Sequence, residues 1–233
     1  MINVKKHYFL RAIFASALSF GLATSVGAAT LQLDFDTSFG DPLDPDTGSP
    51  DGPAPWLTAF FDDGGTAGSV TLTLTVGTVG GASVTDVYLN VDDAIDISGF
   101  NMTNSSGPGN QASSSIDWMT DNYKAGNDGK FDILIGFGNN AFTAGETSTF
   151  DITADGLVAS SFNIWSTPDP SEIDPSGPFL GAAKFQSTSG CETGLTGGEC
   201  SDWVGAVPVP AAVWLFGSGL LGLIGVARRK ARA

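Results

Sequence analysis

The chain has 233 residues and a formal net charge of −15. Residues 30–207 contain all 25 Asp and Glu residues but only three lysines, so this segment has a net charge of −22, whereas the charged residues at both ends are all basic. That middle segment contains no Arg, and the one histidine of the chain, His7, precedes it. These absences exclude Ser-His-Asp and Cys-His catalysis, His-ligated zinc and bidentate Arg recognition of phosphate from the segment, and its negative charge argues against a nucleic-acid partner.

The first 29 residues have the order of a secretion signal. Basic residues open the segment, apolar residues 12–26 follow without a charge, and the small residues 27–29 precede a polar stretch. This order predicts a signal peptide at residues 1–29, cleaved after Ala28 or Ala29. The alternative is an uncleaved membrane anchor, for which the apolar stretch is short compared with the ~20 residues of a bilayer span.

Residues 30–190 contain several short runs in which apolar and polar residues alternate. In Val70–Val76 the alternating polar residues are threonines, and the same period of two recurs in four other runs: Leu31–Phe35, Val87–Val91, Phe131–Phe137 and Phe150–Ile152. Gly- and Asp-rich turns separate the runs, and Asp128-Gly129 is placed as a hairpin turn. The pattern predicts an all-β ectodomain at residues 30–190, an antiparallel β-sandwich of jelly-roll type.

Acidic residues crowd the start of this domain, in a stretch rich in Gly and Pro. The candidate ligands for a cation are Asp34, Asp36, Asp41, Asp44 and Asp46. Carboxylates and loop carbonyls are the oxygen ligands that Ca²⁺ takes, although the spacing is not that of an EF-hand. The alternative is a solvated acidic loop, and no other cofactor is expected.

The two cysteines, Cys191 and Cys200, lie close together near the end of the acidic segment. In an exported chain such a pair predicts a disulfide, and the alternative is a reactive thiol. We expect residues 191–206 to form a disulfide-closed loop and a linker to the C-terminal tail.

The tail, residues 207–233, opens with Val207-Pro208-Val209-Pro210 and continues without a charge to residue 227. This length predicts one transmembrane helix at about residues 210–227, with a buried core helix as the alternative. The basic residues at 228–232 keep that end cytoplasmic by the positive-inside rule, so the acidic domain faces the opposite side.

The tail resembles the PEP-CTERM sorting signal of Gram-negative bacteria, which has a Pro-x-Pro motif, one membrane helix and a basic end. The residues that carry the resemblance are Val207, Pro208, Val209, Pro210, Arg228, Arg229 and Lys230; Val209 stands where the family usually has Glu. The resemblance implies an exosortase as partner and an inner-membrane-anchored precursor that later reaches the cell surface or extracellular matrix. It also implies an association with extracellular polysaccharide and biofilm.

The sequence therefore favours a non-enzymatic surface or matrix protein, with polysaccharide and calcium as candidate ligands. Four tryptophans are candidates for stacking on sugar rings: Trp56, Trp118, Trp165 and Trp203. Two alternatives stay open. One is an extracellular glycan hydrolase that uses paired Asp carboxylates, and the other is a membrane-retained protein that is never cleaved.

Overall fold

The computed structural model describes residues 27–39, 49–105, 107, 109–126, 129–169, 177–188 and 201–207. The described residues form eleven β-strands and two 3₁₀ turns, η1 (Ile97–Gly99) and η2 (Ala159–Phe162), and no α-helix. The strands are β1 (Thr30–Phe39), β2 (Leu57–Asp62), β3 (Ser69–Val76), β4 (Ser83–Leu89), β5 (Asn101–Asn104), β6 (Ser115–Lys124), β7 (Lys130–Gly136), β8 (Phe142–Thr143), β9 (Thr147–Thr153), β10 (Gly181–Gln186) and β11 (Ser201–Ala206).

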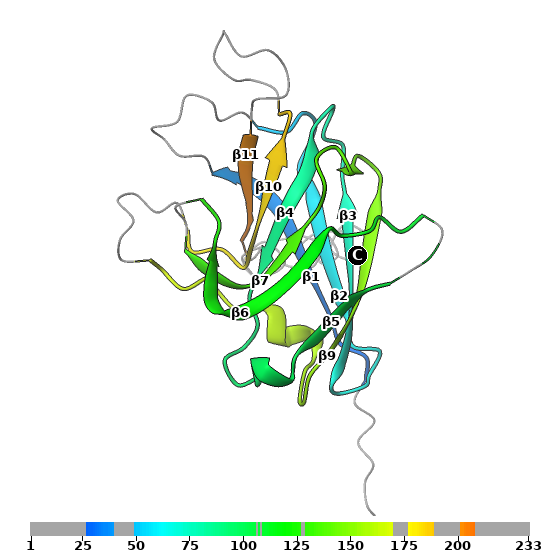
Figure 1. Ribbon diagram of the computed structural model, residues 1–233, viewed down its shortest axis with the longest axis vertical. Coiled ribbons are helices and arrows are strands. Elements are labelled where there is room, and N and C mark those ends of the chain that lie inside the picture. The colour runs from blue at the N-terminus through cyan, green and yellow to red at the C-terminus, as the bar shows by residue number, and fades with distance from the viewer. Residues whose placement is uncertain are drawn as a thin grey trace, which may run out of the picture.

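Ten of these strands follow one hydrogen-bonded path, in the order β5-β9-β3-β2-β1-β11-β10-β4-β7-β6, and β8 pairs with β4. Every pairing between the named strands is antiparallel. The sheet curls into a nearly closed barrel, with both 3₁₀ turns at one end (Figure 1). The opening lies between β5 and β6, where the rings of Phe100 and Trp118 meet at 5.6 Å. The predicted all-β antiparallel fold is confirmed.

The interior of the barrel is filled by the apolar face of each strand. In β3 the burial alternates along the strand, with valine and leucine buried and threonine outside, as a half-buried strand requires. The largest buried side chains include Phe35, Phe61 and Phe150. At the end with the 3₁₀ turns, Phe162 of η2 stacks on Phe61 at 4.3 Å, so η2 closes the core there.

A second apolar cluster lies on the other face of β1, β4, β10 and β11. Its residues alternate with those of the interior: Tyr88 and Ala182 belong to it, whereas their neighbours Val87 and Ala183 face the main core. Trp203 and Phe179 complete this cluster with their rings. Burial raises the pKa of Tyr88 to about 12, with a smaller contribution from the charge of Asp86. Strands β4 and β10 are therefore largely buried on both faces, whereas β1 contributes only Phe39 to this cluster.

Strand β11 falls within the segment that the sequence predicts as a linker. It pairs with β1 on one side and β10 on the other, so it is central to the sheet. Val204 and Ala206 are fully buried in the interior. The prediction of a linker at residues 201–206 is wrong, because these residues gain both ladder hydrogen bonds and core packing, and the folded domain extends to Ala206.

Candidate functional site

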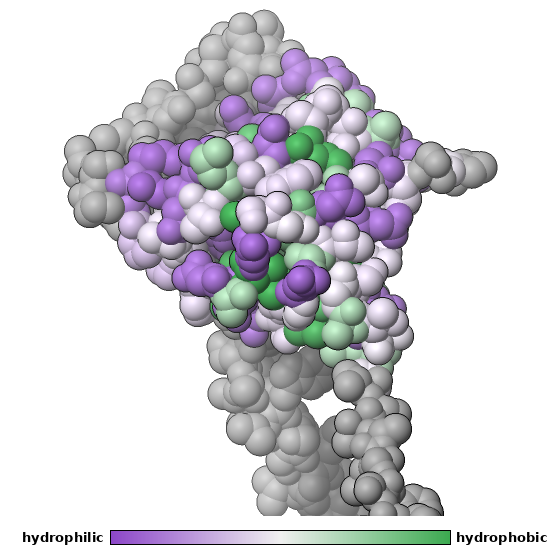
Figure 2. Space-filling model, turned by 60° about the horizontal axis from the view of Figure 1, so that its bottom comes forward, coloured by the Kyte–Doolittle hydropathy of each residue, from purple (hydrophilic) through white to green (hydrophobic). Residues whose placement is uncertain are grey.

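Two hollows open on the end of the barrel that carries the 3₁₀ turns, and residues in or next to η1 line both of them. The smaller has a volume of about 90 Å³ and is lined by Val91, Ile95 and Ile97 together with the carboxylates of Asp92, Asp93 and Asp132. The larger, about 430 Å³, is lined by small residues such as Gly68 and Ala154 together with Asp96 and Asp155. In Figure 2, which turns this end toward the viewer, hydrophobic residues form small patches between hydrophilic ones.

Asp132 lies in β7 at the point where both neighbouring strands stop pairing regularly. Beyond the end of β4, the Val91 N–H donates to Asp132 Oδ2 at 3.0 Å. On the other side β6 has a register shift, and the Asp121 N–H donates to Asp132 Oδ1 at 2.8 Å. Asp121 has a φ of +50°, a left-handed conformation that Asp tolerates better than most residues. The carboxylate thus replaces two missing ladder acceptors and holds the irregular part of β6.

The surroundings of Asp132 shift its pKa in opposing directions. Burial raises the pKa, hydrogen bonds from the N–H groups of Val91 and Asp121 lower it, and the nearby charges of Asp121 and Asp93 raise it; the net result is an increase. A carboxyl of raised pKa beside a second carboxylate is an arrangement suited to acid–base chemistry. The hollow is nevertheless smaller than the roughly 300–1,000 Å³ of typical small-molecule sites.

The larger hollow has the size of a ligand site but a different lining. The Asp96 carboxylate accepts hydrogen bonds from both the N–H and the hydroxyl of Ser98 and so caps η1. The side-chain hydrogen bond and then the backbone hydrogen bond lower the pKa of Asp96. The described residues that line this hollow include carboxylates that could bind sugar hydroxyls, and none of them is aromatic.

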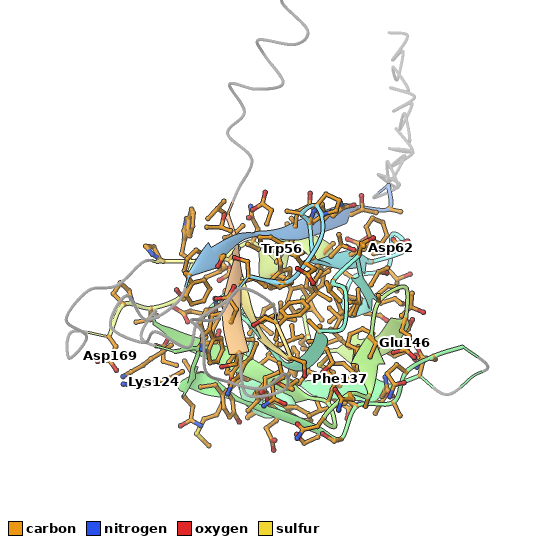
Figure 3. All side chains as sticks on the ribbon, turned by 90° about the horizontal axis from the view of Figure 1, so that it is seen from above. Trp56, Asp62, Lys124, Phe137, Glu146 and Asp169 are labelled. Atoms are coloured by element: carbon orange, nitrogen blue, oxygen red, sulfur yellow. The ribbon has the colours of Figure 1, made fainter. Side chains whose placement is uncertain are left out.

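The four candidate tryptophans differ in how much ring they present. Trp56, which Figure 3 labels, packs against the core and donates its Nε1–H to the Gly52 carbonyl at 3.1 Å. Trp118 is partly buried against Phe100, and Trp203 lies in the second cluster with Lys184 Nζ 5.7 Å from its ring centroid. Trp165 is 46% exposed. Among the candidate tryptophans, Trp165 therefore presents the most ring to a ligand.

The structure places two of the five candidate calcium ligands. Asp34 and Asp36 lie on the outward face of β1, where Asp34 accepts a hydrogen bond from the Gln32 side chain and Asp36 one from the Thr37 hydroxyl. Asp41, Asp44 and Asp46 lie outside the described residues. Within the described ranges, no three His, Cys, Asp or Glu side chains gather as a metal site requires.

The sorting motif begins at the last described residue, Val207, which follows β11 directly and is 36% exposed. The rest of the predicted tail, including Pro208, Val209, Pro210, Arg228, Arg229 and Lys230, lies outside the described residues. So do Cys191, Cys200 and residues 1–26 of the predicted signal peptide. In the part of the chain that is described, no helix has the length and apolar character needed to cross a membrane.

Sequence reasoning did not single out Asp132 or Asp93 as candidate site residues. Asp132 follows the alternation of its strand as an ordinary outward polar residue, although Asp is disfavoured in strands. This low strand propensity is the feature of the sequence that could have indicated a special role for Asp132. Its hydrogen bonds to β6 and to the segment after β4 depend on pairings that the sequence does not reveal.

No protein-family model, curated protein or solved structure with which the chain was compared matches it. The functional reasoning therefore rests on the residues of this chain.

Proposed function

We propose that the chain is an exported, non-enzymatic surface or matrix protein whose acidic domain is delivered by an exosortase-type tail. The observation that carries the proposal is the charge division, with all 25 acidic residues in residues 30–207 and basic residues at both ends. Such a division is typical of exported, membrane-inserted chains. In a signal peptide, basic residues precede the apolar segment, and basic residues beside a membrane helix keep that end on the cytoplasmic side.

The topology of the domain is compatible with this delivery. Strand β11 is antiparallel to β1, so the end of β11 points the same way as the start of β1. The chain thus enters at Ala29 and leaves at Val207 toward the same end of the barrel. From Val207 to Ala211 a fully extended chain spans at most roughly 14 Å, so the domain lies close to the proposed membrane segment.

We further propose that the barrel is flattened in the manner of a jelly-roll sandwich, because strands far apart in the sheet, such as β3 and β4, share one interior cluster. Polysaccharide is the ligand class that we propose, with Trp165 as the contact. An aromatic ring that is 46% exposed offers a hydrophobic face on which a sugar can stack.

Mass spectrometry of the protein from an exosortase-bearing Gram-negative host tests the sorting proposal. We expect the mature product to lack Arg228–Ala233, and we expect replacement of Pro208 and Pro210 by alanine to leave the precursor in the inner membrane. A control chain with Asp36→Asn, an exposed change inside the domain, should be processed normally. A surface product that still carries Arg228–Ala233 contradicts processing and supports the membrane-retained alternative.

A glycan hydrolase is the second candidate, and the small hollow around Asp132 is the observation that favours it. Asp132 and Asp93 supply two carboxyl groups in one hollow, and the pKa of Asp132 is raised. Reducing-sugar release from the exopolysaccharide of the host tests this candidate. If Asp93→Asn abolishes this activity while the free energy of unfolding stays unchanged, the result would support the hydrolase over the non-enzymatic proposal.

A further inference from the structure

The first hydrogen bonds of the folded domain join Ala29 to Asp63, beyond the last ladder pair of β1 and β2, Thr30 with Asp62. The Ala29 N–H donates to Asp63 Oδ1 at 2.8 Å, and the Asp63 N–H donates to the Ala29 carbonyl at 3.2 Å. Gly27, Ala28 and Ala29 are all exposed, and of these three residues Ala29 is the one that hydrogen-bonds to the domain. Among the residues at the predicted cleavage boundary, Ala29 is therefore the first that is hydrogen-bonded to the folded domain.

Asp63 is a buried carboxylate that backbone N–H groups surround. Besides Ala29, the Gly65 N–H donates to Oδ1 at 2.9 Å and the Ala159 N–H of η2 donates to Oδ2 at 3.4 Å. Asp63 is 5% exposed, and within the described residues no Lys or Arg side chain forms an ion pair with it. A buried charge is stabilised most when an opposite charge accompanies its hydrogen bonds.

We propose that export cleavage occurs between Ala28 and Ala29 and that the new α-amino group of Ala29 forms an ion pair with the Asp63 carboxylate. The reaction is amide hydrolysis by a signal peptidase: water adds across the bond, Ala28 keeps a carboxylate and Ala29 becomes an ammonium. The nitrogen that donates to Asp63 as an amide at 2.8 Å then donates as a cation. This inference rests on the proposed export of the chain.

Cleavage one residue later has a different consequence for the same carboxylate. A chain that begins at Thr30 loses both Ala29 hydrogen bonds and leaves the new ammonium one residue away from Asp63. Of the two cleavage positions that the sequence predicts, only the first converts the existing contact into an ion pair.

The first measurement is the N-terminal mass of the full chain after expression in a Gram-negative host that exports it. A product that begins at Ala29 supports the inference, and a product that begins at Thr30 or further along overturns it. A product that retains residues 1–28 overturns the export proposal itself and the inference with it.

The second measurement asks whether the ammonium and the carboxylate interact. The processed chain that begins at Ala29 is compared, in a mild detergent, with one that keeps Gly27-Ala28, each with and without Asp63→Asn. Asp63→Asn removes the charge and keeps one side-chain oxygen as acceptor; the loss of the second acceptor oxygen is common to both chains and cancels in the comparison. We expect the substitution to raise the unfolding equilibrium constant roughly three- to tenfold more in the chain that begins at Ala29, since an ammonium–carboxylate ion pair is lost only there.

Asp62→Asn is the matched control, because Asp62 is the adjacent carboxylate and its side chain takes no part in the Ala29 contact; its Oδ1 accepts a hydrogen bond from the Gly64 N–H at 2.8 Å. Figure 3 labels Asp62 near the point where the chain enters β1. We expect Asp62→Asn to have the same effect in both chains. Equal effects of Asp63→Asn in both chains overturn the ion pair. If Asp63→Asn prevents folding, the free energies of unfolding of the two chains that keep Asp63 are compared instead. The inference requires the chain that begins at Ala29 to be the more stable.

Discussion

The buried carboxylate of Asp202 gives the domain a pH dependence that a single substitution can remove. Asp202 is 1% exposed in the central strand β11, and the Ser38 hydroxyl donates to its Oδ2 at 2.7 Å. Burial raises the pKa of Asp202 from its ordinary value of 3.8 to about 6, although hydrogen bonds from Ser38 and from the Trp203 backbone favour the ionised form. At neutral pH the folded protein therefore holds this charge at a cost.

The size of the effect follows from the two pKa values. A folded-state pKa above the unfolded one means that the folded protein binds the extra proton, so the free energy of unfolding falls as the pH rises from about 4 to about 6. The full shift corresponds to about 3 kcal/mol, of which about 2 kcal/mol falls between pH 4 and pH 7. For a domain of this size that is a change of roughly 4–8 °C in Tm.

Urea unfolding of wild-type protein and Asp202→Asn at pH 4 and pH 7, followed by tryptophan fluorescence, tests this reasoning. The uncharged Asn cannot ionise, so the free energy of unfolding of the variant should rise by about 2 kcal/mol relative to that of wild type on going from pH 4 to pH 7. Constant packing differences cancel in this comparison. Asp36→Asn, which removes an exposed charge from the neighbouring strand β1, controls for the general acidity of the domain. If the gap between wild type and Asp202→Asn is the same at both pH values, the assignment of a buried, ionising Asp202 is wrong.

Three further outcomes are expected. Gly205→Ala should destabilise the domain by about 1–3 kcal/mol in urea, because a Cβ there would lie 2.3 Å from Phe179, whereas Gly81→Ala, with open space around it, should have little effect. Trp165→Ala should abolish any binding on a glycan array while leaving Tm unchanged, and retained binding would exclude Trp165 as the contact. A chelator should lower Tm if the acidic stretch at the start of the domain binds calcium, and an unchanged Tm would support the solvated-loop alternative.

The sequence predicts strands where apolar and polar residues alternate along the chain. Residues Val70–Val76 show this plainly, since β3 buries its valines and leucines and leaves its threonines outside. Strands β10 and β11 were not predicted because apolar and polar residues do not alternate regularly along them; Ala182 and Ala183 of β10, for example, are adjacent and both fully buried. A period-of-two pattern cannot arise from such residues.

The candidate site was less predictable than the fold for a related reason. The hollow beside Asp132 depends on the register shift in β6 and on the end of β4, two features that arise only when the strands pair. The acidic residues near the start of the domain were conspicuous in the sequence because they are close together along the chain. Asp93 and Asp132 are far apart in the sequence, and only the sheet brings them to one hollow.

A domain with few basic residues has to stabilise its buried carboxylates by other means, and three of them show how. Asp63, Asp132 and Asp202 each accept hydrogen bonds from backbone N–H or hydroxyl groups. Where such bonds outweigh burial, as at Asp63, the pKa is lowered; where burial dominates, as at Asp132 and Asp202, it is raised.

These opposite shifts set limits on the pH at which the domain is most stable. As the pH falls from 7, protonation of Asp202, with its pKa of about 6, and of Asp132 stabilises the folded state. The contribution of Asp63 is present above its unfolded value of 3.8 and is lost only as the pH falls through its lower folded pKa. For these three groups, stability is therefore greatest at a mildly acidic pH, where Asp202 is protonated and Asp63 is still ionised.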